Sequence, residues 1–350
     1  MRRAAETAAA RVRGRKGGFI CPQCLHAGAL ARGCARPMSA GSPQRLDLPP
    51  AFLEKNLADP AWLAALPALL TELAERWAIR VGTHVPGIIY NYVAPATRAD
   101  GTRCILKVSR HVDETRNEIA ALQLWNGEGA ARLIAAEPER GALLLERLQP
   151  GTMLTAVAEE RDDTATRIAA SVLRRLWRPA RAGDGLRPLA SWLGAYDRNR
   201  DALARGAGGF PAALFQRADA LCDDLLASTS EDTVLHGDLH HFNVLLHRPR
   251  QAGRRAALPE DEQWLAIDPK GLAGDRCFDV CQFFRNPLPR GVPLAVITRR
   301  LNIFCHELAL ERRRVKDWCL VHAVLDACWD FEDGRPWQQA VAYAEATLSF

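Results

Sequence analysis

The chain has 350 residues, of which 48% are hydrophobic and 25% charged, the proportions of an ordinary globular protein. This length is sufficient for one large domain or two lobes built on a substantial hydrophobic core. No run approaches eighteen apolar residues, which argues against a membrane-spanning protein.

The net charge of +5 is distributed unevenly. Residues 1–37 hold eight basic side chains and one acidic side chain, a net charge of +7, so the chain from Met38 onward carries −2. A nucleic-acid partner inferred from the overall charge would therefore depend on this leader alone. The mildly acidic remainder suits a cationic small-molecule substrate, and we expect neither a nucleic-acid nor a membrane partner.

Residues 1–45 are rich in Arg, Ala and Gly and show no sustained amphipathic period. They contain Cys21, Cys24, His26 and Cys34, a possible zinc site, although one CxxC without a second spaced pair is weak evidence. We expect this segment to be disordered, or to be an upstream extension from a misassigned start with Met38 as the initiator. It has no apolar core of the kind that a signal peptide needs.

The ten cysteines are scattered and lack the spacing of a secreted disulfide framework. Cys104, Cys222, Cys305 and Cys319 lie in apolar surroundings, where we expect them to pack as small hydrophobic side chains. Reduced thiols in a cytoplasmic protein are the expectation.

The first half of the body alternates between helical and strand patterns. A helical period runs from Leu48 to Arg80, and Pro60 and Pro67 are predicted to break it into shorter pieces. Strands are predicted over 88–94 and 104–108, joined by a hairpin turn at Arg98–Gly101. A helix over 113–125 and strands at 133–134 and 142–145 follow, which is the layout of a small nucleotide-binding lobe.

Residues 146–150 are short and polar and precede Gly151, which indicates a hinge. Mostly helix is predicted after it, over 153–157, 164–177, 189–205 and 211–226, then a catalytic loop and a short hairpin, and helices from Val292 to the end. The polar segment 248–262 is predicted to be a surface loop. We therefore divide the chain into an extension (1–45), a nucleotide-binding N-lobe (46–147) and a C-lobe for catalysis and substrate binding (148–350).

The most informative residues surround Asp238. This aspartate lies in the sequence His236-Gly-Asp after an apolar run, Asn243 follows five residues later, and Asp268 ends a second apolar stretch. Mg-ATP phosphoryl transfer requires a carboxylate that accepts the proton of the attacking hydroxyl, and an Asn and a second carboxylate that hold Mg²⁺. We predict Asp238 as the catalytic base and Asn243 and Asp268 as the metal ligands. His236 joins the catalytic site, where we expect it to brace the loop by hydrogen bonding.

Two residues of the first lobe fit nucleotide binding. Lys107 lies near the end of a strand, from which its ammonium can reach phosphates, and Glu118 on the next helix can pair with it. Glu118 is preferred to Glu114 because its register sets it beside apolar inner residues. The phosphate-covering segment Thr83–Ile88 has one glycine, and no G-x-x-x-x-G-K-[ST] motif occurs anywhere, which argues against a P-loop kinase.

Other polar residues near these motifs have several possible roles. His240 and His241 are adjacent, so their side chains point apart, and loop structure is favoured over a metal site. Asp275 and Asp279 are expected to cap and brace the following helix. Lys270 could contact phosphate or balance the carboxylates, and the sequence does not separate the two roles.

An acidic cluster lies near the C-terminus. Asp326, Asp330 and Asp333 fall at i, i+4 and i+7, on one face of a helix, with Trp329 and Glu332 beside them. Like charges at this spacing repel, and a cationic ligand would remove that cost. A substrate site in which Trp329 stacks on a sugar ring and a solvated helix end both fit the pattern.

Four of these segments together resemble the aminoglycoside/hydroxyurea antibiotic resistance kinase family: LHGDLHHFNVL, AIDPKGLAGD, YNYVAPATRADGTRCILKV and WDFEDG. The resemblance runs from about Leu48 to near the C-terminus. It implies an α+β, protein-kinase-like two-lobed fold, with a small mixed α/β N-lobe and a mostly helical C-lobe. It also implies ATP-dependent phosphorylation of a hydroxyl on a streptomycin-like aminoglycoside.

On the matching positions, the resemblance implies that Asp238 is the base, that Asn243 and Asp268 bind Mg²⁺ and that Lys107 contacts phosphate. It places Glu146 at the start of the adenine-binding hinge, which acts through neighbouring backbone. It favours the acidic cluster around Glu332 as a surface for a cationic substrate. The leader has no counterpart in the family.

Phe242 is bulky for its position beside the metal-binding Asn, and the loop over 248–262 looks enlarged, so both departures put the choice of substrate in doubt. Two other functions remain open. The same chemistry could act on an endogenous amino sugar, aminocyclitol or other metabolite. A nucleotide-binding pseudokinase is the alternative of another class, and the presence of Lys107, Asp238, Asn243 and Asp268 together speaks against it.

Overall fold

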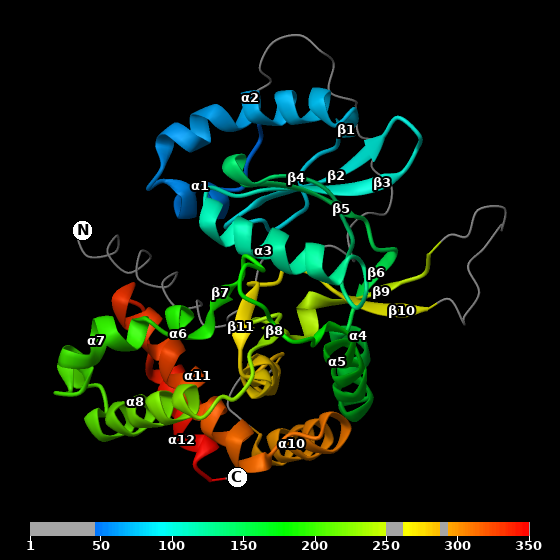
Figure 1. Cartoon of the computed structure of the whole chain (residues 1–350). Helices are drawn as coiled ribbons and strands as arrows, with labels where there is room; N and C mark the ends of the chain where they lie inside the picture. Colours follow the sequence, from blue (N-terminus) through cyan, green and yellow to red (C-terminus); the bar gives the residue numbers. More distant parts are fainter. Residues whose placement is uncertain (1–45, 250–261, 288–292, 350) are drawn as a thin grey trace, which may run out of the picture.

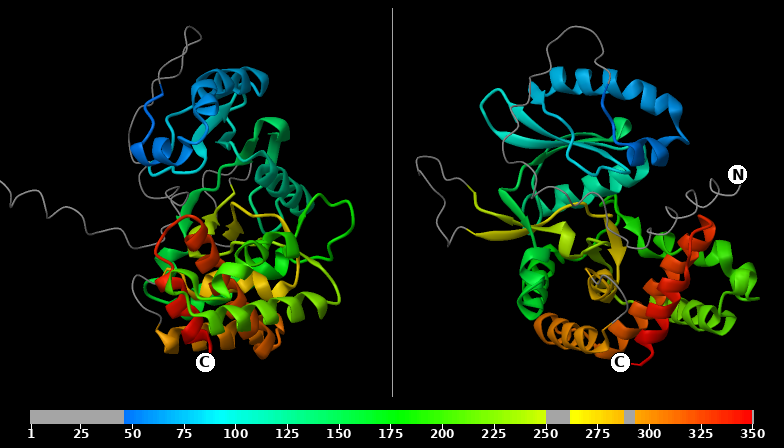
Figure 2. Two further views of the ribbon diagram at one scale, coloured as in Figure 1. Left: turned by 90° about the vertical axis from the view of Figure 1, so that its left-hand side faces the viewer. Right: turned by 180° about the vertical axis from the view of Figure 1, so that it is seen from behind.

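The computed structural model describes residues 46–249, 262–287 and 293–349, and its two parts lie one above the other (Figure 1; Figure 2). The upper part is an antiparallel sheet with helices, and the lower part is mostly helical. Three predictions fall wholly or mostly outside the described residues. They are the possible zinc site of Cys21, Cys24, His26 and Cys34, the initiator Met38, and the surface loop over 248–262.

The upper sheet has five strands in the order β1-β2-β3-β5-β4, each antiparallel to its neighbour. The strands are β1 (Ile79–Val81), β2 (Tyr92–Arg98), β3 (Arg103–Val108), β4 (Leu133–Glu137) and β5 (Ala142–Glu146). The predicted hairpin turn is confirmed, because the Gly101 N–H donates to the carbonyl of Arg98 at 3.0 Å. The strand predicted over 88–94 was placed too early, since β2 begins only at Tyr92.

Three helices accompany this sheet: α1 (Pro50–Asn56), α2 (Pro60–Arg76) and α3 (Val112–Trp125). The predicted break at Pro60 is confirmed, and the Asp59 side chain caps α2 by accepting from the Trp62 N–H at 3.0 Å. The predicted break at Pro67 is wrong, because α2 continues through it and buries Leu66 and Leu70. The helix predicted to reach Arg80 is also wrong there, since Ile79–Val81 pairs with β2 as strand β1.

The lower part contains most of the helices, as predicted, together with short strands, of which only the hairpin after the catalytic loop was predicted. The helices are α4 (Thr155–Ala158), α5 (Asp162–Leu176), α6 (Leu189–Trp192), α7 (Ala195–Leu203), α8 (Ala212–Ala227), α9 (Cys281–Phe284), α10 (Leu294–Leu308), α11 (Arg312–Glu332) and α12 (Gln338–Thr347). The helix predicted over 189–205 is therefore two helices. Residues 193–194 separate them.

The short strands form two three-stranded sheets between the two parts (Figure 1). One has the order β10-β9-β6, from β6 (Pro150–Met153), β9 (Val244–His247) and β10 (Gln263–Ala266). The other has the order β7-β11-β8, from β7 (Arg187–Pro188), β8 (Thr233–Leu235) and β11 (Leu272–Gly274). Both sheets carry loops that hold the polar residues singled out in the sequence.

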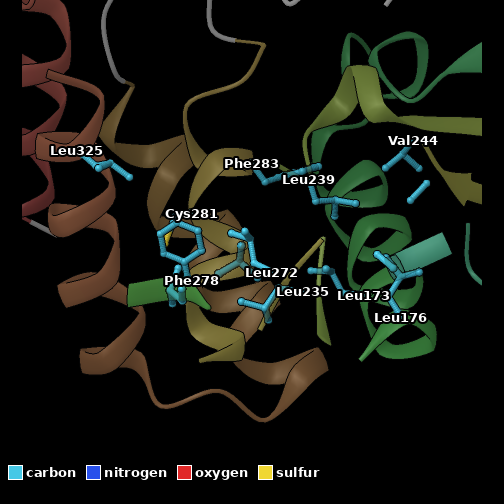
Figure 3. Close-up of a cluster of buried hydrophobic side chains, with 14 of the residues drawn as sticks. Leu173, Leu176, Leu235, Leu239, Val244, Leu272, Phe278, Cys281, Phe283 and Leu325 are labelled. Carbon is cyan, nitrogen blue, oxygen red and sulfur yellow. The ribbon is translucent and has the colours of Figure 1, made fainter. Parts of the chain in front are cut away.

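Beneath these loops lies a core of buried apolar side chains (Figure 3). Leu235, Leu239 and Val244 come from the segment around Asp238, and each is fully buried. They belong to the same core as Phe278 and Phe283, which come from the segment after Asp268. Because protein cores are densely packed, this arrangement fixes the backbone from which the polar side chains project.

Cys104, Cys222 and Cys319 are buried and unbridged, as predicted, and Cys305 is half-buried. Over the three described ranges, no helix combines the length and the apolarity needed to cross a membrane.

Candidate active site

Asp238 lies in the loop between β8 and β9, with its side chain 16% exposed. Two local hydrogen bonds shape this loop. The Asp238 N–H donates to Nδ1 of His236 at 3.2 Å, and the Asp238 carbonyl accepts from Nδ2 of Asn243 at 3.0 Å. The loop therefore carries a half-buried carboxylate, while its backbone is held from both sides.

His236 braces the loop, as predicted, and is not placed to act as a base. Its Nε2 lies 2.9 Å from the carbonyl of Ile267 and its Nδ1 accepts from Asp238, so the proton is on Nε2. Burial lowers the pKa of His236, which keeps the ring neutral, and the ring stacks on Trp125. Both ring nitrogens are engaged by backbone, so His236 is a positioning residue.

Asp279 holds the same loop from below. Its carboxylate accepts from the N–H groups of His236 at 3.0 Å and Gly237 at 2.6 Å, and from Nε1 of Trp177 at 3.0 Å. Burial raises the pKa of Asp279, and these hydrogen bonds and His236 oppose that rise. The sequence predicted that Asp279 would brace the next helix. The structure shows it bracing the loop of Asp238.

Asp275 caps the turn that follows, as predicted. Its Oδ1 accepts from the Cys277 N–H at 2.9 Å, and its Oδ2 accepts from Nε1 of Trp318 at 2.6 Å. This carboxylate also pairs with Arg314 at 2.5 Å, which joins the turn to α11.

Lys107, Glu118 and Asp268 come together in one buried cluster. The Lys107 ammonium lies 2.6 Å from Oε2 of Glu118, so the predicted pair is confirmed, and it also contacts Oδ1 of Asp268. The pair was predicted within the upper part of the molecule. The third member, Asp268, is 161 residues from Lys107 in the sequence, and its contact with Lys107 joins the upper part to the lower.

The ionisation of this cluster follows from burial and charge together. Burial would raise the pKa of Asp268, but Lys107 and Lys270 outweigh it and hold that pKa well below its usual range. Burial raises the pKa of Glu118, and Lys107 only partly opposes it. Burial would lower the pKa of Lys107, but Asp268 and Glu118 outweigh it and raise that pKa. Asp268 is thus the carboxylate held ionised, the form that a cation binds.

Asn243 and Asp268 lie at the same end of a strand pair. β9 and β10 are antiparallel with Val244 opposite Ala266, and the Ile267 N–H donates to the carbonyl of Asn243 at 3.0 Å. The amide and carboxylate oxygens supplied at this end are the hard ligands that Mg²⁺ prefers. The described ranges contain no group of three or more His, Cys, Asp and Glu that could hold a metal, so zinc-type ligation does not fit here.

A cleft lies beside this cluster, with about 680 Å³ of space between its walls, part of it open to solvent. Apolar residues of both parts line it, and Lys107, Glu118 and Asp268 lie along one side. Its lining residues are Val85, Val93, Ile105, Lys107, Glu118, Ala131, Leu145, Glu146, Arg147, Leu148, Leu245, Ile267 and Asp268. The predicted phosphate-covering segment contributes Val85, and the predicted hinge contributes Glu146.

The hinge is held by a histidine that sequence reasoning missed. His247 on β9 lies 3.3 Å from the Glu146 carboxylate through Nε2, and its Nδ1 accepts from the Gln149 N–H at 3.1 Å. The hydrogen bond to His247 lowers the pKa of Glu146. These contacts fix both ends of the segment 146–149, whose middle lines the cleft. Nothing in the sequence around His247 signals this contact.

The remaining histidines of the loop do not form a metal site. His241 is fully buried, its ring stacks on Phe283 at 3.7 Å between centroids, and burial lowers its pKa far below the usual range. His240 accepts from the Phe242 N–H at 3.3 Å and so shapes the turn. Loop structure is therefore confirmed for both.

The acidic residues of α11 do lie on a helix, as predicted, but arginines pair with them. Glu332 binds Arg198 at 2.8 Å and Asp330 binds Arg335 at 2.8 Å. Asp333, the C-cap, contacts Arg335 as well, and Asp326 contacts Arg285. Trp329 packs edge-on against Trp192 at 5.3 Å. The bare acidic face expected from the sequence is therefore largely neutralised within the chain.

Arg285 connects this cluster with the loop of Asp238. Burial lowers its pKa, while the charges of Asp238 and Asp330 act in the opposite direction, so its guanidinium lies within electrostatic range of both. Nothing in the sequence signals this residue, because an arginine after two phenylalanines carries no pattern of its own.

The chain is similar to a family of known proteins. The model of the aminoglycoside/hydroxyurea antibiotic resistance kinase family matches residues 76–334. A streptomycin 6-kinase of Streptomyces glaucescens is 35% identical over 285 residues, covering 78% of this chain and 86% of that protein. A hydroxyurea phosphotransferase of Kitasatospora aureofaciens is 34% identical over 300 residues, covering 82% of this chain and 80% of that protein.

Among solved structures, a choline kinase of Streptococcus pneumoniae is similar, with a TM-score of 0.53. The alignment covers 82% of this chain and all of that one, at 13% identity. The fold is therefore protein-kinase-like, with an antiparallel sheet in the N-terminal part and a helical C-terminal part, as the sequence predicted.

Proposed function

The chain belongs to the aminoglycoside/hydroxyurea antibiotic resistance kinase family, and from this premise we propose that it phosphorylates a hydroxyl of a streptomycin-like aminoglycoside with Mg-ATP. It is a phosphotransferase with an alcohol group as acceptor. The observation that carries the proposal is that Lys107 and Asp268 line one cleft, while Asn243 is hydrogen-bonded both to the Asp238 loop and to the residue before Asp268.

Each residue has a role that follows from its position. Asp238 accepts the proton of the acceptor hydroxyl, since its carboxylate projects from a loop held by His236 and Asp279. Lys107, fixed by Glu118, contacts the phosphates, and the backbone near Glu146 receives the adenine. Asn243 and Asp268 would hold Mg²⁺, which neutralises phosphate charge when bound.

The choice of acceptor depends on charge. A body with net charge −2 favours a cation, and the acidic cluster of Asp326, Asp330, Glu332 and Asp333 beside Trp329 supports an aminoglycoside. Its pairing with arginines supports a second candidate, a small uncharged acceptor such as the hydroxyurea named for one relative. A kinase of an endogenous amino sugar remains the alternative with the same chemistry.

The proposal is tested by measuring Mg-ATP turnover with a panel of streptomycin, other aminoglycosides, amino sugars and hydroxyurea. Turnover on streptomycin is expected, and Asp238→Asn should reduce kcat by about 10² to 10⁴, because the general base is lost while the shape is kept. The variant should still bind Mg-ADP, since Asp238 lies outside the cleft lining. Turnover on hydroxyurea or an amino sugar alone would replace the aminoglycoside assignment.

A further inference from the structure

Lys270 lies close to Asp238 and Asp268, yet none of the roles above involves it. Its ammonium is 3.6 Å from Oδ2 of Asp238, and its side chain is 25% exposed. Its charge also acts on Asp268 and Glu118. Lys270 is therefore close to the base and within electrostatic range of the carboxylate that would hold the metal.

The backbone leaves Lys270 little freedom to lie elsewhere. Its N–H donates to the carbonyl of His236 at 2.7 Å, which ties it to the Asp238 loop. Gly237 has a φ of +78°, and a Cβ there would meet the Lys270 side chain at 3.0 Å. The two segments thus approach each other as closely as a glycine allows.

The next residue, Gly271, holds this segment against α3, on the side away from the Asp238 loop. Gly271 has a φ of +63°, and a Cβ there would overlap the carbonyl oxygen of Asn117 on α3. Lys270 therefore lies on a segment confined between the Asp238 loop and the helix that carries Glu118. This confinement fixes the backbone position from which the Lys270 side chain projects.

The position of Lys270 matches the path of the group that moves. In the reaction, the acceptor oxygen bonds to the γ-phosphorus as the bond to the β,γ-bridging oxygen breaks, ADP keeps that electron pair, and Asp238 takes the hydroxyl proton. The phosphoryl group must therefore pass between the base and the metal ligands. The Lys270 ammonium places a positive charge beside that path.

We propose that Lys270 is a catalytic residue that binds the phosphoryl group during its transfer, while Lys107 binds the phosphates that remain in ADP. This assignment depends on ATP-dependent transfer at the proposed site and not on which acceptor is used. It selects between the two roles that the sequence left open for Lys270.

The test compares Lys270→Gln, Lys270→Met and Lys270→Arg with the wild-type protein. Calorimetry with Mg-ATP and Mg-ADP without acceptor measures the affinity for each nucleotide, and steady-state assays give kcat and KM. In Lys270→Gln and Lys270→Met we expect affinity for ATP to fall about tenfold and affinity for ADP to stay unchanged, because one charged contact to the γ-phosphate is lost. We expect kcat to fall by about 10² to 10³, with partial rescue in Lys270→Arg.

Lys55→Gln is the matched control, since Lys55 lies on α1 over the Tyr90 ring and away from the cleft lining. It should behave as wild type. Unchanged ADP binding also shows that the Lys270 variants are folded. An equal loss of ATP and ADP binding, an unchanged kcat, or a lower kcat with an unchanged ATP-to-ADP affinity ratio would each overturn the proposal. The binding arm does not depend on the acceptor, so it stands even where the aminoglycoside assignment fails.

Discussion

Gly271 shows at the scale of one residue how the site depends on backbone fit. Its φ of +63° is almost that of Gly334, at +64°, but the surroundings of the two differ. A Cβ at Gly334 would meet nothing within 4 Å, whereas a Cβ at Gly271 would overlap the Asn117 carbonyl. Asn117 precedes Glu118, so this contact sets where α3 places the partner of Lys107.

The variants Gly271→Ala and Gly334→Ala therefore distinguish the cost of a left-handed backbone from the cost of steric overlap with Asn117. Gly334→Ala should cost about 1 kcal/mol of unfolding free energy, the cost of a left-handed non-glycine residue. Gly271→Ala should cost several times more and raise KM for ATP, because α3 must move. Urea unfolding and nucleotide kinetics measure the two effects. Equal costs in the two variants would contradict the overlap.

The residues that the sequence identified share short spacings or a distinctive order. Asp238 and Asn243 are five residues apart, and Lys107 and Glu118 are eleven apart, so local elements bring them together. Partners that the sequence did not identify come from far away: Arg198 and Glu332 are 134 residues apart. The acidic pattern on α11 was visible, but its neutralisation was not, because the spacing of one helix does not reveal what packs on it.

At the scale of elements, Arg300 joins three helices. It lies on α10 with only 2% of its surface exposed, and it pairs with Asp162 at the start of α5 at 2.5 Å. It also donates to the carbonyls of Phe283 at 2.8 Å and Asn286 at 2.6 Å, at and after the end of α9. These bonds satisfy backbone acceptors that the helix itself leaves without partners.

Arg300→Met should therefore lower the free energy of unfolding by about 3 to 5 kcal/mol, since it leaves a carboxylate and buried carbonyls without their partner. The neighbouring Arg299→Met is a matched control. Arg299 pairs with Asp163 at 3.3 Å, and both side chains are about half exposed, so its loss should cost about 1 kcal/mol or less. Chemical denaturation of both variants measures the difference. Similar losses would show that burial of Arg300 does not determine its contribution.

Long, periodic elements were predictable, and short ones were not. The sequence predicted α3, α5 and α8 within a few residues, because their apolar positions repeat over three or more turns. The strands β7, β8 and β11 have two or three residues each, too few for an alternation to show. Pro67 predicts a helix break, but α2 keeps its buried stripe through it, so packing outweighs the missing hydrogen bond.

At the scale of the whole molecule, burial of histidines connects stability to pH. His322 lies inside α11 with 5% of its surface exposed, and its Nδ1 is 3.7 Å from Asp326. Burial first, and then Arg285, lowers the pKa of His322 far below its usual range. The folded protein therefore keeps this ring neutral at a pH where the unfolded chain protonates it, near 6.5 and below.

Because the unfolded state then binds more protons, the His322 contribution destabilises the protein as pH falls below about 6.5, by up to ~1.4 kcal/mol per pH unit. The variant His322→Gln has no imidazole at this position and lacks this contribution. The difference in unfolding free energy between wild type and the variant should therefore become smaller as the pH falls from 6.5 to 5. Other groups titrate in both proteins, among them Glu118 and Asp279, whose pKa values are raised by burial. Their contributions cancel in the difference between wild type and variant. Urea unfolding at several pH values measures it.

His306→Gln is the control, because the His306 side chain is 87% exposed and folding changes its surroundings little. Its difference from wild type should stay constant over the same range. A constant difference for His322→Gln as well would mean that the folded protein admits a proton at His322, and hence that α11 yields there under mild acid.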